Sequence, residues 1–177
     1  AAQLLEAGFV TAFEEATIAD AVVAASLAQA KAFWAIRHDL SLVQKYEGGS
    51  IKHDVSVPVA CVPDFIDRAS AAVIQAMPGC RPLPFGHLGD GNVHFNVSQP
   101  PDMDKQAFID RWDEIAALVH AIVVELDGSI SAEHGIGVLK RELLKTVKEP
   151  VELEMMRRIK RAFDPDNILS PGRILDL

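Results

Sequence analysis

The sequence has little cysteine and a shortage of positive charge. Its two cysteines, among 177 residues, stand in no Cys-x-x-Cys spacing, which argues against a disulfide framework and fits ordinary buried thiols in a reducing compartment. The chain has 17 Lys and Arg residues against 25 Asp and Glu residues, and the resulting net charge of -8 argues against a broad nucleic-acid-binding surface. Small anionic molecules remain candidate ligands if the few basic side chains converge.

Long apolar runs are missing as well. No segment approaches the ~18 to 20 apolar residues of a membrane-spanning helix, and the start lacks the charged and apolar regions of a signal peptide. Together with the unpaired cysteines, these absences predict a soluble, cytoplasmic protein. The 49% of residues that are apolar suffice for the core of one domain.

The beginning of the chain is unusual for a domain. Ala1 to Ala7 have the composition of the end of a helix, and Gly8 to Thr17 then predict a loop. A start inside an element indicates a fragment of a longer polypeptide. A long Ala-rich helix is expected from Ala19 to about Lys45, ended by Gly48-Gly49.

The middle of the chain predicts alternating strands and helices. The expected strands are 51–57, 83–88, 92–98 and a short one at 128–132, and the helices between them are 63–77 and 104–126. This β-α-β-β-α-β order matches an α+β, ferredoxin-like sandwich, in which helices cover one face of an antiparallel sheet. Two further helices, 137–147 and 151–163, are expected before a tail that contains Pro and Gly.

Two short segments carry the side chains with the most chemistry. They are Gly86-His-Leu-Gly-Asp-Gly-Asn-Val-His94 and Ser131-Ala-Glu-His-Gly-Ile-Gly137. Two imidazoles and a carboxylate, from His87, His94 and Glu133, can make a three-ligand metal site. Such a site leaves a coordination position open for substrate or water, as catalytic zinc sites do.

The hairpin decides whether the two histidines can meet. Seven positions apart, His87 and His94 would point to opposite faces of one uninterrupted strand. A tight turn at Gly89-Asp90-Gly91 places them on neighbouring strands instead, where they can sit opposite one another on one side of the sheet, and Glu133 can complete the set. Each histidine taken singly is as readily a hydrogen-bonded strand residue, so the combination is what favours a metal site.

The donor set does not choose one metal. Imidazole and carboxylate without thiolate suit Zn²⁺, Fe²⁺, Mn²⁺ or Co²⁺, and Zn²⁺ is the first choice. The ion would act as a Lewis acid on a substrate hydroxyl or carboxylate. His134, directly after Glu133, is a candidate general base, since imidazole transfers protons readily near neutral pH. A supporting hydrogen bond or a fourth metal ligand is the alternative for His134.

These segments carry a resemblance to a known family. Phe85 to Val97, Ser131 to Gly137 and the ending Phe163-Asp-Pro-Asp-Asn-Ile-Leu-Ser-Pro-Gly172 are similar to the C-terminal domain of FAD-linked oxidases. Within this family, which includes D-lactate dehydrogenases and glycolate oxidase subunits, the chain most resembles D-2-hydroxyglutarate dehydrogenases. The resemblance extends over nearly all of the chain from the long first helix onward.

The resemblance implies a role for each site residue. It makes His87, His94 and Glu133 the metal ligands, His134 the base near the flavin, and Arg37, Ser41, Lys52, Asn96 and His134 the substrate-binding residues. Ser41 stands where the related enzymes carry threonine. Positions i and i+4 share one helix face, so Arg37 and Ser41 can hold one carboxylate together. Without the resemblance, Arg37 and Lys52 would more commonly be solvated surface charges.

The implied reaction is oxidation of a D-2-hydroxy acid to the 2-oxo acid, with FAD as the hydride acceptor. FAD would be bound mainly by an N-terminal domain that has no counterpart in these residues, so the chain alone is expected to be inactive. An electron-transfer flavoprotein or a quinone is the implied electron acceptor. The residues themselves also allow a metal-dependent hydrolase, or a non-catalytic ferredoxin-like binding module with structural histidines.

Overall fold

The computed structural model describes residues 2–177, apart from the side chains of Ala2 and Ser41. The chain divides into two compact units, Ala1–Val43 and Gln44–Leu177, and each is described by itself. The prediction that residues 1–177 form one domain stays a prediction. Among the described residues, no helix is both long enough and apolar enough to cross a membrane.

The first unit consists of two helices, α1 (Ala2–Glu14) and α2 (Leu27–Val43). The predicted loop at Gly8 is wrong, because α1 continues through it to Glu14. α2 begins later than predicted. The Ser26 hydroxyl accepts the N–H of Gln29 at 3.2 Å, and the Gln29 amide oxygen accepts the N–H of Ala25 at 2.7 Å. This Ser-x-x-Gln pattern is a helix-start signature and explains the boundary.

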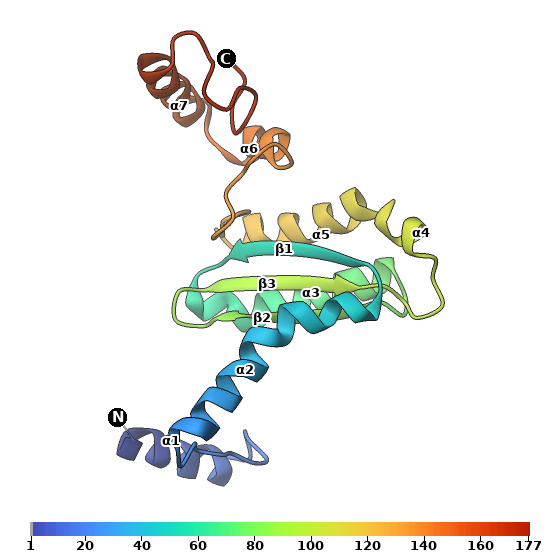
Figure 1. The fold of residues 1–177 in the computed structure, drawn as a ribbon, viewed down its shortest axis with the longest axis vertical. Coiled ribbons are helices and arrows are strands. Elements are labelled where there is room, and N and C mark those ends of the chain that lie inside the picture. The colour runs from blue at the N-terminus through green and yellow to red at the C-terminus, as the bar shows by residue number, and fades with distance from the viewer. Residues whose placement is uncertain (1) are drawn as a thin grey trace. The chain divides into compact units, whose positions relative to one another are not determined.

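The second unit is built on a three-stranded antiparallel sheet (Figure 1). β1 (Ser50–Ser56) and β2 (Arg81–His87) both pair with β3 (Asn92–Ser98), which gives the order β1-β3-β2. Helices α3 (Val62–Ala76) and α5 (Trp112–Glu125) pack against this sheet. The combination of an antiparallel sheet with packed helices confirms the predicted α+β class.

Both helices cover the same face of the sheet. Phe95 of β3 meets Phe65 of α3, with ring centroids 5.6 Å apart, and His53 of β1 meets His120 of α5 at 5.5 Å. Phe95 and His53 are partners across the β1–β3 ladder, so their side chains lie on one side. The largest fully buried apolar side chains between the layers are Ile51, Val55, Phe65, Val73, Met77, Phe95, Val97, Phe108, Ile115, Val119 and Val123.

Three elements of this unit are shorter than predicted, and one of them, the helix expected at 137–147, begins only at Arg141. The helix expected at 104–126 is divided into α4 (Lys105–Ile109) and α5, and the strand expected at 128–132 is a single bridge between Ser56 and Ser129. Pairing stops there because the N–H of Ser131 donates to the Ser129 hydroxyl at 3.4 Å, and the N–H of Ala132 takes its place at the Asp54 oxygen, at 3.3 Å. The remaining elements are the 3-10 turns η1 (Gln44–Glu47) and η2 (Val59–Cys61) and the helices α6 (Arg141–Val147) and α7 (Pro150–Phe163).

Candidate metal centre

The face of the sheet that turns away from α3 and α5 carries polar side chains. Lys52 of β1 lies opposite Asn96 of β3, and Asp54 lies opposite His94. These residues alternate along their strands with the core residues, so their side chains point to the other side of the sheet. Phe85 of β2 adjoins His94, with ring centroids 5.1 Å apart.

The β2–β3 hairpin brings His87 and His94 to this face. His87 pairs with Asn92, so its ring lies diagonal to His94 rather than directly opposite. Two glycines of the segment, Gly86 and Gly91, are required by close approach of the backbone. A Cβ on Gly86 would lie 2.1 Å from the Asn92 oxygen, and a Cβ on Gly91, whose φ is +73°, would lie 2.0 Å from the oxygen of Val57.

The Glu133 carboxylate reaches both histidines. Its Oε1 lies 3.5 Å from Nδ1 of His87, and its Oε2 lies 3.6 Å from Nε2 of His94. Donor atoms around a tetrahedral zinc, with bonds of about 2.0 to 2.1 Å, are about 3.3 Å from one another. The observed separations are close to that spacing. Glu133 is 45% exposed, so this point is accessible from solvent.

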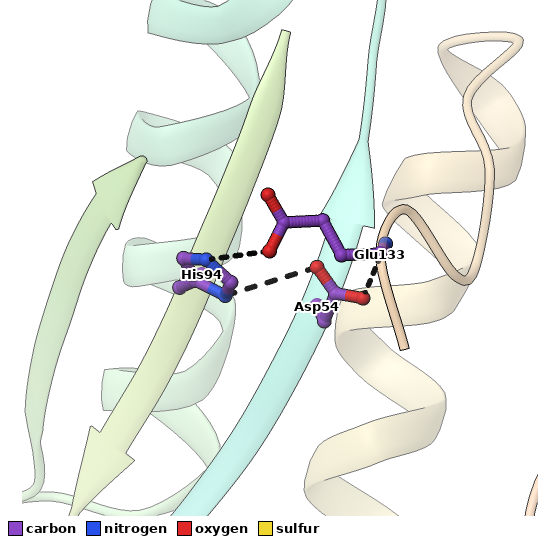
Figure 2. A group of neighbouring side chains, drawn as sticks. All are labelled: Asp54, His94 and Glu133. Carbon is purple, nitrogen blue, oxygen red and sulfur yellow. Dashed lines mark hydrogen bonds and ion pairs between the residues drawn. The ribbon is translucent and has the colours of Figure 1, made fainter. Parts of the chain in front are cut away.

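Asp54, which the sequence analysis did not select, holds the arrangement together (Figure 2). Its Oδ2 accepts the backbone N–H groups of Glu133 and His134, both at 2.8 Å. Its Oδ1 lies 3.7 Å from Nδ1 of His94 and accepts the Asn92 side-chain N–H at 3.3 Å. In the described part of the chain, Asp54, His94 and Glu133 form the group whose donor atoms all lie within 4.8 Å of one another, and His87 is not a member of it.

Asp54 is only 3% exposed but favours the charged form. Burial alone would raise the pKa of its carboxyl, but the N–H groups of His134 and Glu133 outweigh burial and hold the pKa below its usual value. A carboxylate beside Nδ1 of His94 orients that ring and leaves Nε2 to face Glu133. The alternation of β1 could have revealed Asp54, because it puts Asp54 on the same face as Lys52.

His134 lies at the solvent side of this group. Its side chain is 70% exposed, its Nδ1 is 3.8 Å from Oδ2 of Asp54, and its ring centroid is 6.0 Å from that of His94. Gly135 and Gly137, with φ of +77° and +59°, adopt a backbone conformation that favours glycine. A Cβ at either position would meet nothing within 4 Å, so a ligand has room to approach this segment.

The structure describes the side chains of three of the four other predicted substrate-binding residues. Lys52 is exposed and Asn96 is buried, with the Asn96 amide donating to Oε1 of Gln44 at 2.7 Å. Arg37 lies on α2 in the first unit and is partly buried. Ser41 is also on α2, but its side chain lies outside the described part of the chain. The roles of all four residues stay predictions.

Comparison with known proteins identifies the family. The family described as FAD linked oxidases, C-terminal domain, matches residues 1–174. This chain belongs to that family. The match covers almost the entire length of this FAD-linked oxidase domain and confirms the resemblance predicted from the three motifs.

Several curated relatives of this FAD-linked oxidase domain are named D-2-hydroxyglutarate dehydrogenase. The protein from Xanthomonas citri pv. viticola is 35% identical over 171 residues, covering 96% of this chain and 36% of the relative. The protein from Stutzerimonas stutzeri is 37% identical over 161 residues, covering 91% and 34%. A probable mitochondrial enzyme of Oryza sativa subsp. japonica is 34% identical over 171 residues, covering 97% and 29%. The chain thus spans about a third of the length of these relatives.

The donor atoms of this FAD-linked oxidase domain fit a divalent metal ion. Imidazole nitrogens and carboxylate oxygens suit Zn²⁺ and its first-row neighbours, and no cysteine lies in the group. His94 and Glu133 present atoms at ligand spacing, and His87 contacts the second oxygen of Glu133. A bound ion would face solvent on the side of His134, where a substrate could share it.

Proposed function

We propose that this chain is the substrate- and metal-binding domain of a flavin-dependent dehydrogenase that oxidises a D-2-hydroxy acid, 2-hydroxyglutarate-like or lactate, to the 2-oxo acid. The observation that carries the proposal is the Glu133 carboxylate, which lies within 3.6 Å of both His87 and His94 and next to the exposed His134. The names of the relatives, D-2-hydroxyglutarate dehydrogenase, support the substrate class.

The proposed ligands are His87, His94 and Glu133, with Asp54 as a positioning residue for the His94 ring. The ion, with zinc as first choice, would supply Lewis acidity that lowers the pKa of the substrate hydroxyl. FAD, bound mainly outside this chain, would accept the hydride. The chain's own part is to hold the hydroxy acid at this face and to remove its hydroxyl proton.

His134 is the proposed proton acceptor. Its exposed ring can reach a substrate that occupies the open side of the metal centre, next to His94. The carboxylate of Asp54, 3.8 Å from Nδ1 of His134, would stabilise the imidazolium that forms when the ring takes the proton. The exposed backbone of Gly135 leaves space beside the ring for the flavin.

A carboxylate of the substrate would bind further along the sheet. Lys52 and Asn96 are two positions along their strands from Asp54 and His94, which corresponds to about 7 Å. That span suits the distal carboxylate of a short dicarboxylic hydroxy acid. The family resemblance assigns Arg37 and Ser41 to substrate binding as well, and their role is part of the proposal. A cytoplasmic location, and an electron-transfer flavoprotein or a quinone as acceptor, are also part of the proposal.

The test uses the full-length protein that contains this chain, purified without chelator and kept anaerobic. D-2-hydroxyglutarate, D-lactate, D-malate and glycolate are added in turn, and bleaching of the flavin absorbance is followed. At least one D-2-hydroxy acid should reduce the flavin, and His134→Gln should slow that reduction by a factor of about 100 or more.

The matched control is Glu114→Gln, which removes a carboxylate from the surface pair with Arg111 and should leave the rate unchanged. Flavin reduction at the parent rate in both His134→Gln and Glu133→Gln would refute the assignment of the site. Metal-dependent ester or amide cleavage without flavin reduction would favour a hydrolase instead.

A further inference from the structure

A second group of basic side chains lies outside the metal ligands. Lys45 of η1, Lys52 of β1 and Lys105 of α4 line one pocket of about 260 Å³. All three lysines are exposed, and the residues that line this pocket include no carboxylate. In a chain whose net charge is -8, this is a local concentration of positive charge.

The charges of these lysines are not compensated within the protein. Among the described residues, no carboxylate oxygen lies within 4.0 Å of any of the three ammonium groups, whereas Lys145 and Lys148 each have a carboxylate partner at 2.9 Å or less. The nearby carboxylate of Glu47 is paired with Arg81 at 2.8 Å. Like charges gathered around a pocket repel one another and attract small anions.

The pocket also offers an unsatisfied hydroxyl and a fixed wall. Oγ of Ser50, which lines the pocket, is buried and has no hydrogen-bond partner in the described part of the chain. Rotation of this side chain toward the pocket would let a bound anion accept the hydroxyl hydrogen. Gly49 donates its N–H to Oε1 of Gln99 at 2.6 Å, and a Cβ on Gly48 would lie 2.7 Å from Cδ of Gln99. The wall is therefore packed in place before any ligand arrives.

We propose that this pocket binds a small anion carrying at least two negative charges, of carboxylate or phosphate chemistry, and does so without the metal ion. A monovalent anion would leave most of the lysine charge uncompensated, so the pocket should prefer a polyvalent one. Lys52 is shared with the proposed substrate-binding set. Lys45, Lys105 and Ser50 have no part in the proposed reaction, and they make this a site that extends beyond it.

The experiment is an NMR titration of the ¹⁵N-labelled 177-residue chain, freed of metal with a chelator that is then removed. Glutarate, pyrophosphate and butyrate are added separately at constant ionic strength. Glutarate or pyrophosphate should shift the amide signals of Gly48, Gly49 and Ser50 in a saturable way. Saturation by glutarate alone identifies a carboxylate site, and saturation by pyrophosphate alone identifies a phosphate site.

Substitutions separate a local site from a general charge effect. Lys45→Gln and Lys105→Gln should each weaken binding by about three- to fivefold, the upper range for one lost exposed ion pair. The matched control is Lys148→Gln, which removes the same charge from a residue that does not line the pocket and should change affinity by less than about twofold. The amide signals of the core report whether each variant is folded.

Three results would overturn the proposal. They are the absence of saturable shifts, binding of butyrate as tight as that of glutarate, and equal weakening by Lys105→Gln and Lys148→Gln. Because the sample holds no metal and no flavin, these results are independent of the proposed oxidation. If no hydroxy acid reduces the flavin, the conclusion drawn from the anion titration still stands. If no anion binds in the titration, the conclusion drawn from flavin reduction still stands.

Discussion

The Asp54 carboxylate accepts the backbone N–H of Glu133 at 2.8 Å, although the two residues are 79 positions apart in the chain. With the equivalent bond from His134, it attaches an otherwise irregular segment to the edge of β1. The position of the Glu133 side chain relative to His94 therefore depends on main-chain hydrogen bonds to one buried carboxylate.

Replacement of Asp54 by Asn should loosen this segment. Oδ2 accepts two N–H groups and Oδ1 accepts a third, from Asn92, so an amide nitrogen at either position would face a donor. We expect Asp54→Asn to lower the free energy of unfolding by about 1 to 3 kcal/mol, the cost of leaving a buried polar group unsatisfied. Urea unfolding measures the loss, and hydrogen exchange of the Glu133 and His134 amides should accelerate.

Asp64→Asn is the matched control. Asp64 is 57% exposed, and among the described residues its side chain is paired only with Arg68, at 3.4 Å, so its replacement should change the free energy of unfolding by less than about 0.5 kcal/mol. Unchanged exchange of both loop amides in Asp54→Asn would contradict the anchoring role of this carboxylate.

Metal binding distinguishes ligands from positioning residues. We expect the chain to bind about one Zn²⁺, and His94→Ala and Glu133→Gln to abolish binding, because their atoms lie at ligand spacing. Asp54→Asn should weaken binding by only about 10- to 100-fold, as the loss of a supporting carboxylate does. Competition with a coloured zinc chelator gives each affinity, and circular dichroism confirms that each variant is folded.

His87→Ala decides between two ligand sets. If His87 is a ligand, its removal should cost as much affinity as removal of His94. If Asp54→Asn abolishes binding while His87→Ala does not, the ligand set is Asp54, His94 and Glu133 instead. Glu114→Gln, which removes an exposed carboxylate from α5 on the opposite face of the sheet, should leave affinity unchanged. A folded parent that binds no divalent ion would refute the metal centre.

The parts of this fold that sequence analysis anticipated depend on local signals. The expected boundaries of β3 agree with the structure, because its apolar alternation begins directly after the Gly89-Asp90-Gly91 turn. The apolar spacing of α3 likewise places Phe65, Ala69 and Val73 on one buried face.

The features that sequence analysis missed depend on contacts between distant segments. The strand expected at 128–132 does not continue past Ser129, because the N–H of Ala132 and not that of Ser131 donates to the Asp54 oxygen, and no local pattern reports that bond. Asp54 has its partners 79 and 80 positions away. The start of α2 is different, since Ser26 and Gln29 form a local capping signal that was present but masked by the Ala-rich composition around it.

The close approach of the two hairpin strands makes Gly86 irreplaceable. A Cβ there would lie 2.1 Å from the oxygen of Asn92, which belongs to the backbone of β3 and cannot move without breaking the ladder. We expect Gly86→Ala to lower the free energy of unfolding by about 2 kcal/mol or more and to weaken zinc binding, since His87 and His94 flank this contact. Gly89→Ala, where a Cβ meets nothing within 4 Å, should be close to neutral. Equal unfolding midpoints in urea for the two variants would contradict this account.

The buried pair His53 and His120 should make stability depend on pH. Burial is the main cause that lowers the pKa of each ring to about 4, and the nearby charge of Lys140 adds to the effect on both, while the bond from His53 to the Phe95 oxygen opposes it. An imidazole in the unfolded chain has a pKa of about 6.5. The unfolded state therefore binds more protons between these values, and stability is complete above about pH 6.5 and falls as the pH drops toward 4.

Substitution of His120 isolates its share of this dependence. Nε2 of His120 is buried and has no hydrogen-bond partner among the described residues, so His120→Leu removes a titrating group without breaking a bond at that atom. Urea unfolding at pH 7, 6 and 5 should show a parent that loses about 3 to 4 kcal/mol between pH 7 and pH 5 and a variant that loses about half as much. His38→Gln, which changes an exposed imidazole, serves as the control and should follow the parent. Only a group that binds protons differently in the folded and unfolded states contributes to the dependence of stability on pH. If the parent and His120→Leu lose the same stability over this range, His120 is not such a group and the buried rings do not set the pH response.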